Sequence, residues 1–157
     1  LEAGKEVTWI PSYGPEMRGG TAHCFVVISD KPIGSPVVRY PKVAVVFNNP
    51  SFDKYEPIIA ENGLLVVNNS LIKQESRRND IQSVYVPATK IAEEIGNVRL
   101  MNMVLLGATM QALPIVPIDC IRHALEAHLP AHRRDMLDAN YVALGRGEEY
   151  VKQGVIG

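Results

Sequence analysis

The chain has 157 residues, of which 46% are hydrophobic and 21% are charged, and its formal net charge is -1. This composition is ordinary for a globular protein, and the length suits one core, so we expect a single domain over residues 1–157. The near-zero charge excludes the electrostatic signature of proteins that bind nucleic acid or anionic membranes. No apolar run approaches the ~20 residues that span a bilayer, and no signal-peptide pattern opens the chain. We therefore expect a cytoplasmic protein with neither nucleic acid nor membrane as a partner.

Side chains that ligate metals are few and scattered. Cys24 and Cys120 are the two cysteines, and they lie far apart without metal-ligand spacing. Because iron–sulfur clusters generally take four cysteine ligands, this chain is unable to hold one alone. His128 and His132 are four residues apart, but Pro130 breaks the helix that would align them. The sequence therefore predicts no metal site, and no cofactor bound by this chain alone.

The first residues predict a helix end and then a pair of strands. Residues 1–5 have the pattern of a last helical turn with Gly4 after it, which predicts a very short first element or further residues upstream. Residues 7–10 and 22–29 are rich in β-branched and aromatic side chains, and we expect Pro11 to end the first strand. The segment between them has no helical pattern and is short for a crossover, so the pair is predicted to be antiparallel.

The connection between these strands is the most informative segment. Loops of this size in compact domains are usually functional or disordered, and the fixed φ of Pro11 and Pro15 argues against disorder. We expect the loop to face a ligand or another protein, although a Glu16–Arg18 ion pair that only stiffens the loop is the alternative. The candidate residues are Ser12, Tyr13, Gly14, Pro15, Glu16, Met17, Arg18, Gly19, Gly20 and Thr21.

The middle of the chain alternates strands and helices. Apolar runs predict strands at residues 43–47, 64–67 and 83–86, the first two of them buried on both faces. Ser51 is the expected N-cap of a helix that ends near residue 60 and that Pro57 shortens or breaks. The polar run 73–80 predicts a solvated connection. Residues 88–95 predict a helix that Gly96 terminates.

The carboxyl third is predicted to be helical. Residues 100–113 are apolar nearly all round, which predicts a helix buried against the sheet. Residues 117–129 and 131–144 have apolar stripes at helical spacing, and Gly145 is expected to end the second of these helices. Residues 147–157 are predicted to form a tail.

The order of these elements indicates an α/β fold. We expect a Rossmann-like three-layer domain with a mostly parallel sheet, at least one antiparallel strand and a helical C-terminal third. Ligands of such sheets bind outside the carboxyl ends of the strands, where asparagine pairs follow two of the predicted strands. The alternative is that each pair only forms a turn. The candidate residues at this edge are Asn48, Asn49, Asn68 and Asn69.

The residues by themselves do not complete an active site. The sequence has no Walker A motif, no G-x-G-x-x-G between a strand and a helix, and no nucleophile elbow. The pair Gly19-Gly20 after Arg18 would suit an anion nest, which is weak support for a nucleotide site. No catalytic residue is therefore assigned to this chain.

A family resemblance covers nearly the whole chain. Residues 7–22, VTWIPSYGPEMRGGTA, closely resemble the loop of the gamma subunit of 2-oxoacid:ferredoxin (acceptor) oxidoreductases. The likeness continues through residues 26–36 and returns in residues 96–99, in residues 102–108 and in the last helices. The amino-acid sequence of residues 12–20 most resembles the corresponding loop of the 2-oxoglutarate and branched-chain 2-oxoacid enzymes. Two differences are His23, where this subtype would carry Asn, and the missing opening strand with its glycine-rich turn.

The resemblance implies a non-autonomous subunit of a multi-subunit enzyme. Its reaction converts a 2-oxoacid, here expected to be 2-oxoglutarate, and coenzyme A into acyl-CoA and carbon dioxide, and passes two electrons to ferredoxin or another acceptor. The implied partners are alpha, beta and ferredoxin-like delta subunits, which carry thiamine diphosphate, magnesium and iron–sulfur clusters. The loop is expected to face these subunits or coenzyme A through Tyr13, Glu16, Arg18, Gly19 and Gly20. The alternatives are a free-standing module that binds a nucleotide or acyl-CoA without catalysis, and a purely structural subunit that contacts no ligand.

Overall fold

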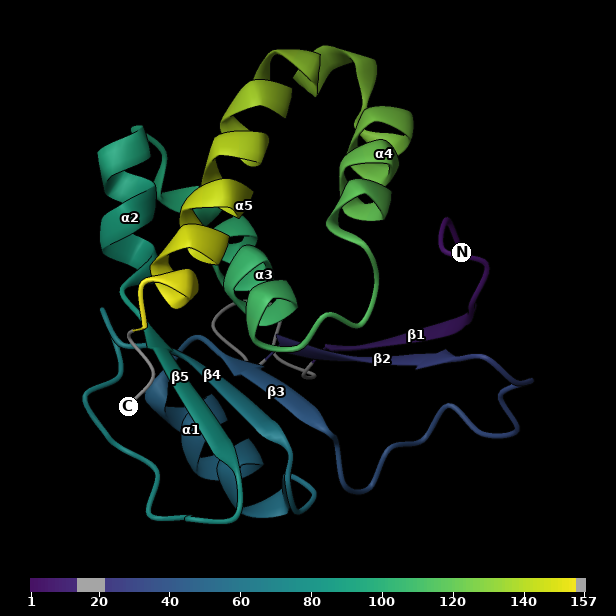
Figure 1. The fold of residues 1–157 in the computed structure, drawn as a ribbon, viewed down its shortest axis with the longest axis vertical. Helices are drawn as coiled ribbons and strands as arrows, with labels where there is room; N and C mark the ends of the chain where they lie inside the picture. The colour runs from purple at the N-terminus through teal and green to yellow at the C-terminus, as the bar shows by residue number, and fades with distance from the viewer. Residues whose placement is uncertain (14–21, 155–157) are drawn as a thin grey trace. The chain divides into compact units, whose positions relative to one another are not determined.

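The computed structural model describes residues 1–13 and 22–154. The chain forms two compact units, Leu1–Tyr40 and Pro41–Gly157. The first contains a pair of antiparallel strands, and the second contains a parallel sheet and the helices (Figure 1). A single domain over the whole chain stays a prediction. Within the described residues, every helix is too short or too polar to cross a lipid bilayer.

The first unit is a two-stranded ribbon. β1 (Glu6–Tyr13) and β2 (Ala22–Ser29) pair in antiparallel orientation along their whole length, which confirms the predicted pair. The prediction that Pro11 ends the first strand is wrong, because Pro11 pairs with Cys24 inside the ribbon. Each strand of a two-stranded ribbon has one unpaired side, so a proline is tolerated where its missing N–H would point to that side.

The second unit is organised around a parallel sheet of three strands in the order β3-β4-β5. The strands are β3 (Val43–Val46), β4 (Leu64–Asn68) and β5 (Gln82–Val86). All residues of the central strand β4 are buried. The mostly parallel sheet of the predicted fold is therefore confirmed, and the antiparallel pair forms a sheet of its own.

Helices cover both faces of this sheet, which gives the predicted three layers (Figure 1). One layer consists of α1 (Asn49–Tyr55) and the 3₁₀ turn η1 (Glu56–Ile58). The other layer consists of α2 (Ala88–Ile95), α3 (Met101–Ala112) and α5 (Leu137–Lys152).

Successive side chains of β4 belong to different layers. Leu64 and Val66 pack in the cluster with α2, α3 and α5, whereas Leu65 and Val67 pack in the cluster with α1. This alternation is the period of two that a strand imposes on its side chains. Burial on both faces is confirmed for β4 but is wrong for β3, where Val45 is 37% exposed. β3 is an edge strand next to β4, and α3 and α5 lie mainly against β4 and β5.

The start of α1 differs from the prediction. Asn48, not Ser51, is the N-cap, and its Oδ1 accepts a hydrogen bond from the Ser51 backbone N–H at 3.0 Å. Pro50 lies in the first turn of α1, where a helix does not need the missing N–H. The predicted break at Pro57 is confirmed, since α1 ends at Tyr55 and Pro57 lies in η1.

The carboxyl third is helical as predicted, except for the position of its last helix. Gly96 ends α2 at φ +96°, the turn η2 (Val98–Leu100) leads into α3, and α4 (Ile118–His128) follows. Residues 131–136 form the 3₁₀ segment η3 (Ala131–Met136), and α5 continues past Gly145 to Lys152. The predicted end at residue 144 and the predicted tail from residue 147 are therefore wrong.

Two glycines set the distance between α3 and α5, and they explain this error. A Cβ on Gly107 would lie 2.0 Å from the Leu144 carbonyl oxygen, and a Cβ on Gly147 would lie 2.0 Å from the Val104 carbonyl oxygen. Both distances are far inside van der Waals contact. Glycine near a helix end usually signals a stop, but Gly147 is needed here for close packing of two helix backbones.

The connection from β4 to β5 carries no helix and is held by side-chain hydrogen bonds. Most of its polar side chains are exposed, as predicted, but Ser76 and Arg78 are half-buried. Ser76 Oγ donates to Glu56 Oε1 at 2.6 Å. Arg78 Nη1 donates to the carbonyl oxygens of Glu56 at 3.1 Å and Ile59 at 2.6 Å. These bonds tie the connection to η1.

Arg78 is oriented by a second partner. Its Nε donates to Asp80 Oδ1 at 2.9 Å, and its Nη2 donates to Asp80 Oδ2. This hydrogen bonding lowers the pKa of Asp80 and raises the pKa of Arg78. The fork of the guanidinium is thus oriented by a charged carboxylate, and its Nη1 group donates to the carbonyls of Glu56 in η1 and of Ile59 just after it.

Tyr141 links α5 to α4. Its hydroxyl donates to Glu126 Oε1 at 2.6 Å. Desolvation and then this carboxylate raise the pKa of Tyr141 to about 12. The hydroxyl therefore stays protonated, and able to donate, over the whole neutral range.

Candidate functional site

The carboxyl ends of the three parallel strands lie at one edge of the sheet (Figure 1). Asn48 lies just beyond β3, Asn68 is the last residue of β4, and Pro87 follows β5. Because open α/β sheets bind ligands outside this edge, it is the candidate site of the second unit.

Asn68 is fully buried and joins three elements at this edge. Its Nδ2 donates to Thr89 Oγ1 at 2.9 Å, and its Oδ1 accepts from the Thr89 backbone N–H at 3.4 Å. Met101 Sδ lies 4.0 Å from Asn68 Nδ2 and 3.6 Å from Thr89 Oγ1. The amide therefore fastens the end of β4 to the first turns of α2 and α3.

The residues after Asn68 bind the main chain of neighbouring elements. The Asn69 N–H donates to the Val86 carbonyl at 3.0 Å, and Lys73 Nζ donates to the Asn69 carbonyl at 2.8 Å. Ser70 Oγ accepts from the Lys90 N–H at 3.3 Å. These bonds hold the turn after β4 against β5 and the start of α2.

The four predicted edge residues thus differ in their surroundings. Asn68 is buried, Asn69 is half-buried, and Asn48 and Asn49 are exposed. The side chains of Asn48 and Asn68 make hydrogen bonds within the fold, as the turn-forming alternative expects. A ligand-facing role for this edge stays a prediction. Its amides and hydroxyls are suited to hydrogen bonding rather than to proton transfer at neutral pH.

The predicted loop lies mostly outside the described residues. Ser12 and Tyr13 are strand residues, opposite His23 and Ala22 in the ribbon. Gly14, Pro15, Glu16, Met17, Arg18, Gly19, Gly20 and Thr21 lie beyond what the structure describes. The loop's predicted role therefore stays a prediction.

The described residues do not fit a metal or an iron–sulfur cluster. Within residues 1–13 and 22–154, no three His, Cys, Asp or Glu side chains are grouped so that they could hold a metal ion. Magnesium takes oxygen ligands and clusters take thiolates, so either would need such a group. That this chain alone binds no cofactor stays a prediction.

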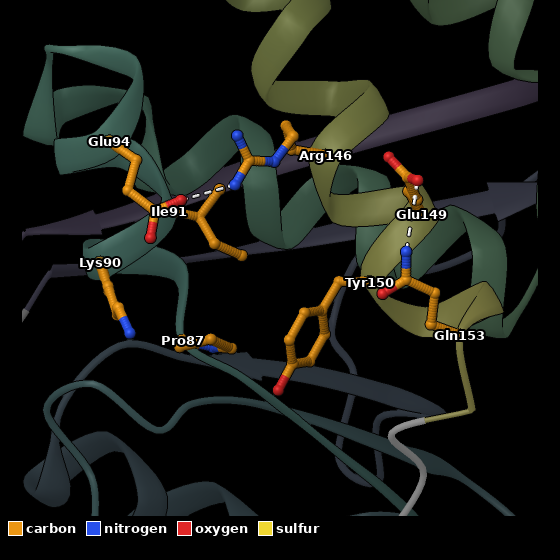
Figure 2. A pocket seen from close by; sticks show the side chains of 8 residues that line it. All are labelled: Pro87, Lys90, Ile91, Glu94, Arg146, Glu149, Tyr150 and Gln153. Carbon is orange, nitrogen blue, oxygen red and sulfur yellow. Dashed lines mark hydrogen bonds and ion pairs between the residues drawn. The ribbon is translucent and has the colours of Figure 1, made fainter.

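A pocket of about 400 Å³ opens between α2 and α5, next to the end of β5 (Figure 2). Arg146 Nη2 donates to Glu94 Oε2 at 2.6 Å, an ion pair between the two helices. Gln153 Nε2 donates to Glu149 Oε1 at 3.3 Å along α5. Figure 2 shows the Lys90 side chain extending from α2 in the direction of Pro87.

This pocket is lined by charges of both signs and was not predicted from the sequence. Lys90 and Arg146 are balanced by Glu94 and Glu149. The described side chains offer hydrogen bonds and ion pairs but no nucleophile with an adjacent base. The predicted last helix ended at residue 144, so the prediction did not include the part of α5 that lines this pocket. The signal that could have revealed it is the spacing of residues 146, 149, 150 and 153, which suits one face of a helix.

Comparison with known proteins gives the family. Residues 1–150 match the family model described as pyruvate ferredoxin/flavodoxin oxidoreductase. The chain belongs to this family. It is 34% identical over 155 residues to the 2-oxoglutarate synthase subunit KorC of Methanocaldococcus jannaschii, covering 98% of this chain and 81% of the relative.

Another relative is much longer than this chain. The ketoisovalerate oxidoreductase subunit VorA of Methanothermobacter marburgensis is 35% identical over 156 residues, which cover 98% of this chain and 32% of VorA. In three dimensions, the chain is similar to the gamma subunit of a keto/oxoacid ferredoxin oxidoreductase from Geobacter sulfurreducens. The TM-score is 0.83 at 23% identity, with 98% of this chain and 82% of the other covered. This chain therefore has the fold of a gamma subunit of the family.

Proposed function

We propose that this chain is the gamma-type component of a 2-oxoacid:ferredoxin oxidoreductase that acts on 2-oxoglutarate. The observation that carries the proposal is the match to KorC, a 2-oxoglutarate synthase subunit, over 81% of its length. VorA is equally similar but has only 32% of its length covered. The KorC match spans most of that subunit, and the sequence of residues 12–20 resembles the loop of the 2-oxoglutarate and branched-chain 2-oxoacid enzymes.

The proposed reaction joins three changes. A 2-oxoacid loses carbon dioxide, its acyl group is transferred to coenzyme A, and two electrons pass to ferredoxin or a similar acceptor. Thiamine diphosphate on a partner subunit would supply the carbanion stabilisation that decarboxylation needs. The described residues of this chain would contribute a three-layer scaffold and a hydrogen-bonding sheet edge, and no chemical step is assigned to them.

The substrate and the assembly are tested together. A tag on this chain should co-purify thiamine-binding and ferredoxin-like subunits from its own cells, and the complex should reduce ferredoxin in a coenzyme A-dependent reaction. We expect kcat/KM for 2-oxoglutarate to exceed those for ketoisovalerate and pyruvate by at least about ten-fold, since a site that pairs the second carboxylate discriminates strongly. The isolated chain should be inert.

The outcomes of this experiment separate the two parts of the proposal. A complex that prefers ketoisovalerate would show that the substrate is wrong and the subunit role right. A chain that purifies without such partners, or that turns over 2-oxoacids alone, would contradict the subunit role itself.

Within the loop, we propose that Arg18 binds an anionic group of coenzyme A or substrate, because a guanidinium fork suits phosphate and carboxylate. In the assembled complex, Arg18→Ala should raise KM for coenzyme A by about 10-fold or more, the effect of losing one charged hydrogen bond. Arg18→Lys should recover part of the loss. Arg77→Ala is the matched control, since Arg77 is exposed in the β4–β5 connection. Unchanged assembly, KM and kcat in Arg18→Ala would remove this residue from the mechanism.

A further inference from the structure

One face of the β1–β2 ribbon consists of apolar or uncharged small side chains. Residues that are opposite in an antiparallel pair lie on the same face, and alternate residues along a strand share that face. The register pairs Val7 with Ile28, Trp9 with Val26 and Pro11 with Cys24. The apolar ribbon face is therefore formed, among the described residues, by Val7, Trp9, Pro11, Ala22, Cys24, Val26 and Ile28.

Much of this face is exposed. Trp9 is 60% exposed, Val26 is 51% exposed and Ile28 is 36% exposed. Along β2, every residue of the apolar ribbon face is exposed, whereas the alternate residues, such as Phe25 and Val27, are half-buried. The exposed side of this strand is thus apolar, the reverse of what a strand facing water shows.

Such a face is energetically unfavourable unless another surface covers it. Large contiguous apolar patches are rare on soluble monomers, and where they occur they mark interaction sites. A two-stranded ribbon has little stability of its own and depends on packing against other structure. The described residues of this face include no charged side chain. Trp9, near its centre, is the type of residue that dominates interface energies.

We propose that the apolar ribbon face docks against another component of the same oxidoreductase, at an uncharged apolar surface of that component. This inference rests on the proposed function. The length of the relatives identifies the occupant: in VorA, a segment like this chain is 32% of one longer polypeptide. In VorA, the segment that matches this chain is therefore joined to additional polypeptide of the same enzyme subunit. In this protein we infer that the neighbour is a partner subunit of the proposed complex.

A charge on this face should break the docking. In the complex assembled with its co-expressed partner subunits, Val26→Lys should weaken association by about 30-fold or more, as loss of an interface hot spot does. Val37→Lys is the matched control, because it is the same chemical change in the same unit at a residue that is 78% exposed and outside the ribbon. It should assemble like the wild type. Circular dichroism of both free variants checks that they fold.

The single tryptophan of the chain provides a second readout that needs no mutation. With only this chain labelled with 5-fluorotryptophan, the ¹⁹F resonance of Trp9 should show a solvent-isotope shift in the free chain and lose it in the complex. Equal assembly of Val26→Lys and wild type, or a Trp9 resonance that stays solvent-exposed in the complex, would overturn the docking proposal. A free chain that self-associates until Val26→Lys makes it monomeric would also overturn it, in favour of a second copy. A wild-type chain that finds no partner subunits would instead contradict the proposed function.

Discussion

Gly147→Ala is expected to destabilise the protein strongly, although alanine is normally the better helix residue. The added Cβ would lie 2.0 Å from the Val104 carbonyl oxygen and 3.0 Å from the Ala108 nitrogen, and both are backbone atoms. Backbone atoms inside α3 are unable to rotate away, so the two helices must separate. We expect the free energy of unfolding to fall by about 3 kcal/mol, the upper range for overpacking a core. Gly107→Ala, whose Cβ would meet the Leu144 carbonyl, should behave alike.

Gly145→Ala is the matched control, because Gly145 lies on the same helix close to Gly147. A Cβ there meets no atom within 4 Å. Since alanine is favoured over glycine inside a helix by about 0.5–1 kcal/mol, this variant should be slightly more stable than wild type. Urea unfolding followed by circular dichroism measures both. The close helix crossing would be disproved if Gly147→Ala and Gly145→Ala shifted the midpoint in the same direction.

The second large effect is expected from Asn68→Asp. The two side chains have nearly the same shape, but the carboxylate has no N–H to donate to Thr89 Oγ1, and the position is fully buried. An unpaired buried charge costs more than a lost neutral hydrogen bond, so we expect about 3 kcal/mol or more of destabilisation at pH 7. Asn69→Asp, at a half-buried neighbour, should cost much less.

The destabilisation by Asn68→Asp should depend on pH in a predictable direction. Burial disfavours the charged form, so the folded-state pKa of the new carboxyl lies above its unfolded value of about 3.9. The unfolded chain releases this proton first as pH rises, and the deficit relative to wild type therefore grows from pH 4 upward. Thermal melts of both proteins between pH 4 and pH 8 measure it. A deficit that is the same at every pH would show that the new carboxyl reaches solvent.

Local signals predicted most of the fold. The apolar runs, Pro57 and Gly96 each act within one element, so the β-strands, the break after α1 and the end of α2 could be placed from the sequence. The errors came from residues whose partners lie elsewhere. Gly147 has the local signature of a helix stop, and only the backbone of α3, about 40 residues earlier in the chain, gives the reason for it. Pro11 is tolerated in β1 because the ribbon has only two strands.

The candidate site was predicted less completely. Parallel strands require their carboxyl ends to share an edge, so the order of strands and helices along the chain was enough to assign Asn48 and Asn68 to one edge. The role of the Asn68 amide depends on α2 and α3, because its side chain contacts Thr89 and Met101. The pocket between α2 and α5 could not be expected while the last helix was thought to end before Arg146. The length of α5, which depends on its packing against α3, therefore determines which of its side chains lie next to α2.

The contact between α3 and α5 also brings backbone hydrogen atoms of one helix close to carbonyl oxygens of the other. The two contacts are reciprocal: Gly107 faces the carbonyl of Leu144, three residues before Gly147, and Gly147 faces the carbonyl of Val104, three residues before Gly107. The hydrogen that occupies each Cβ direction is aimed at a carbonyl oxygen, the geometry of a weak Cα–H···O bond worth about 0.5–1 kcal/mol. The crossing thus has a local pseudo-two-fold axis, and main-chain polarity as well as apolar burial holds the helical layer together.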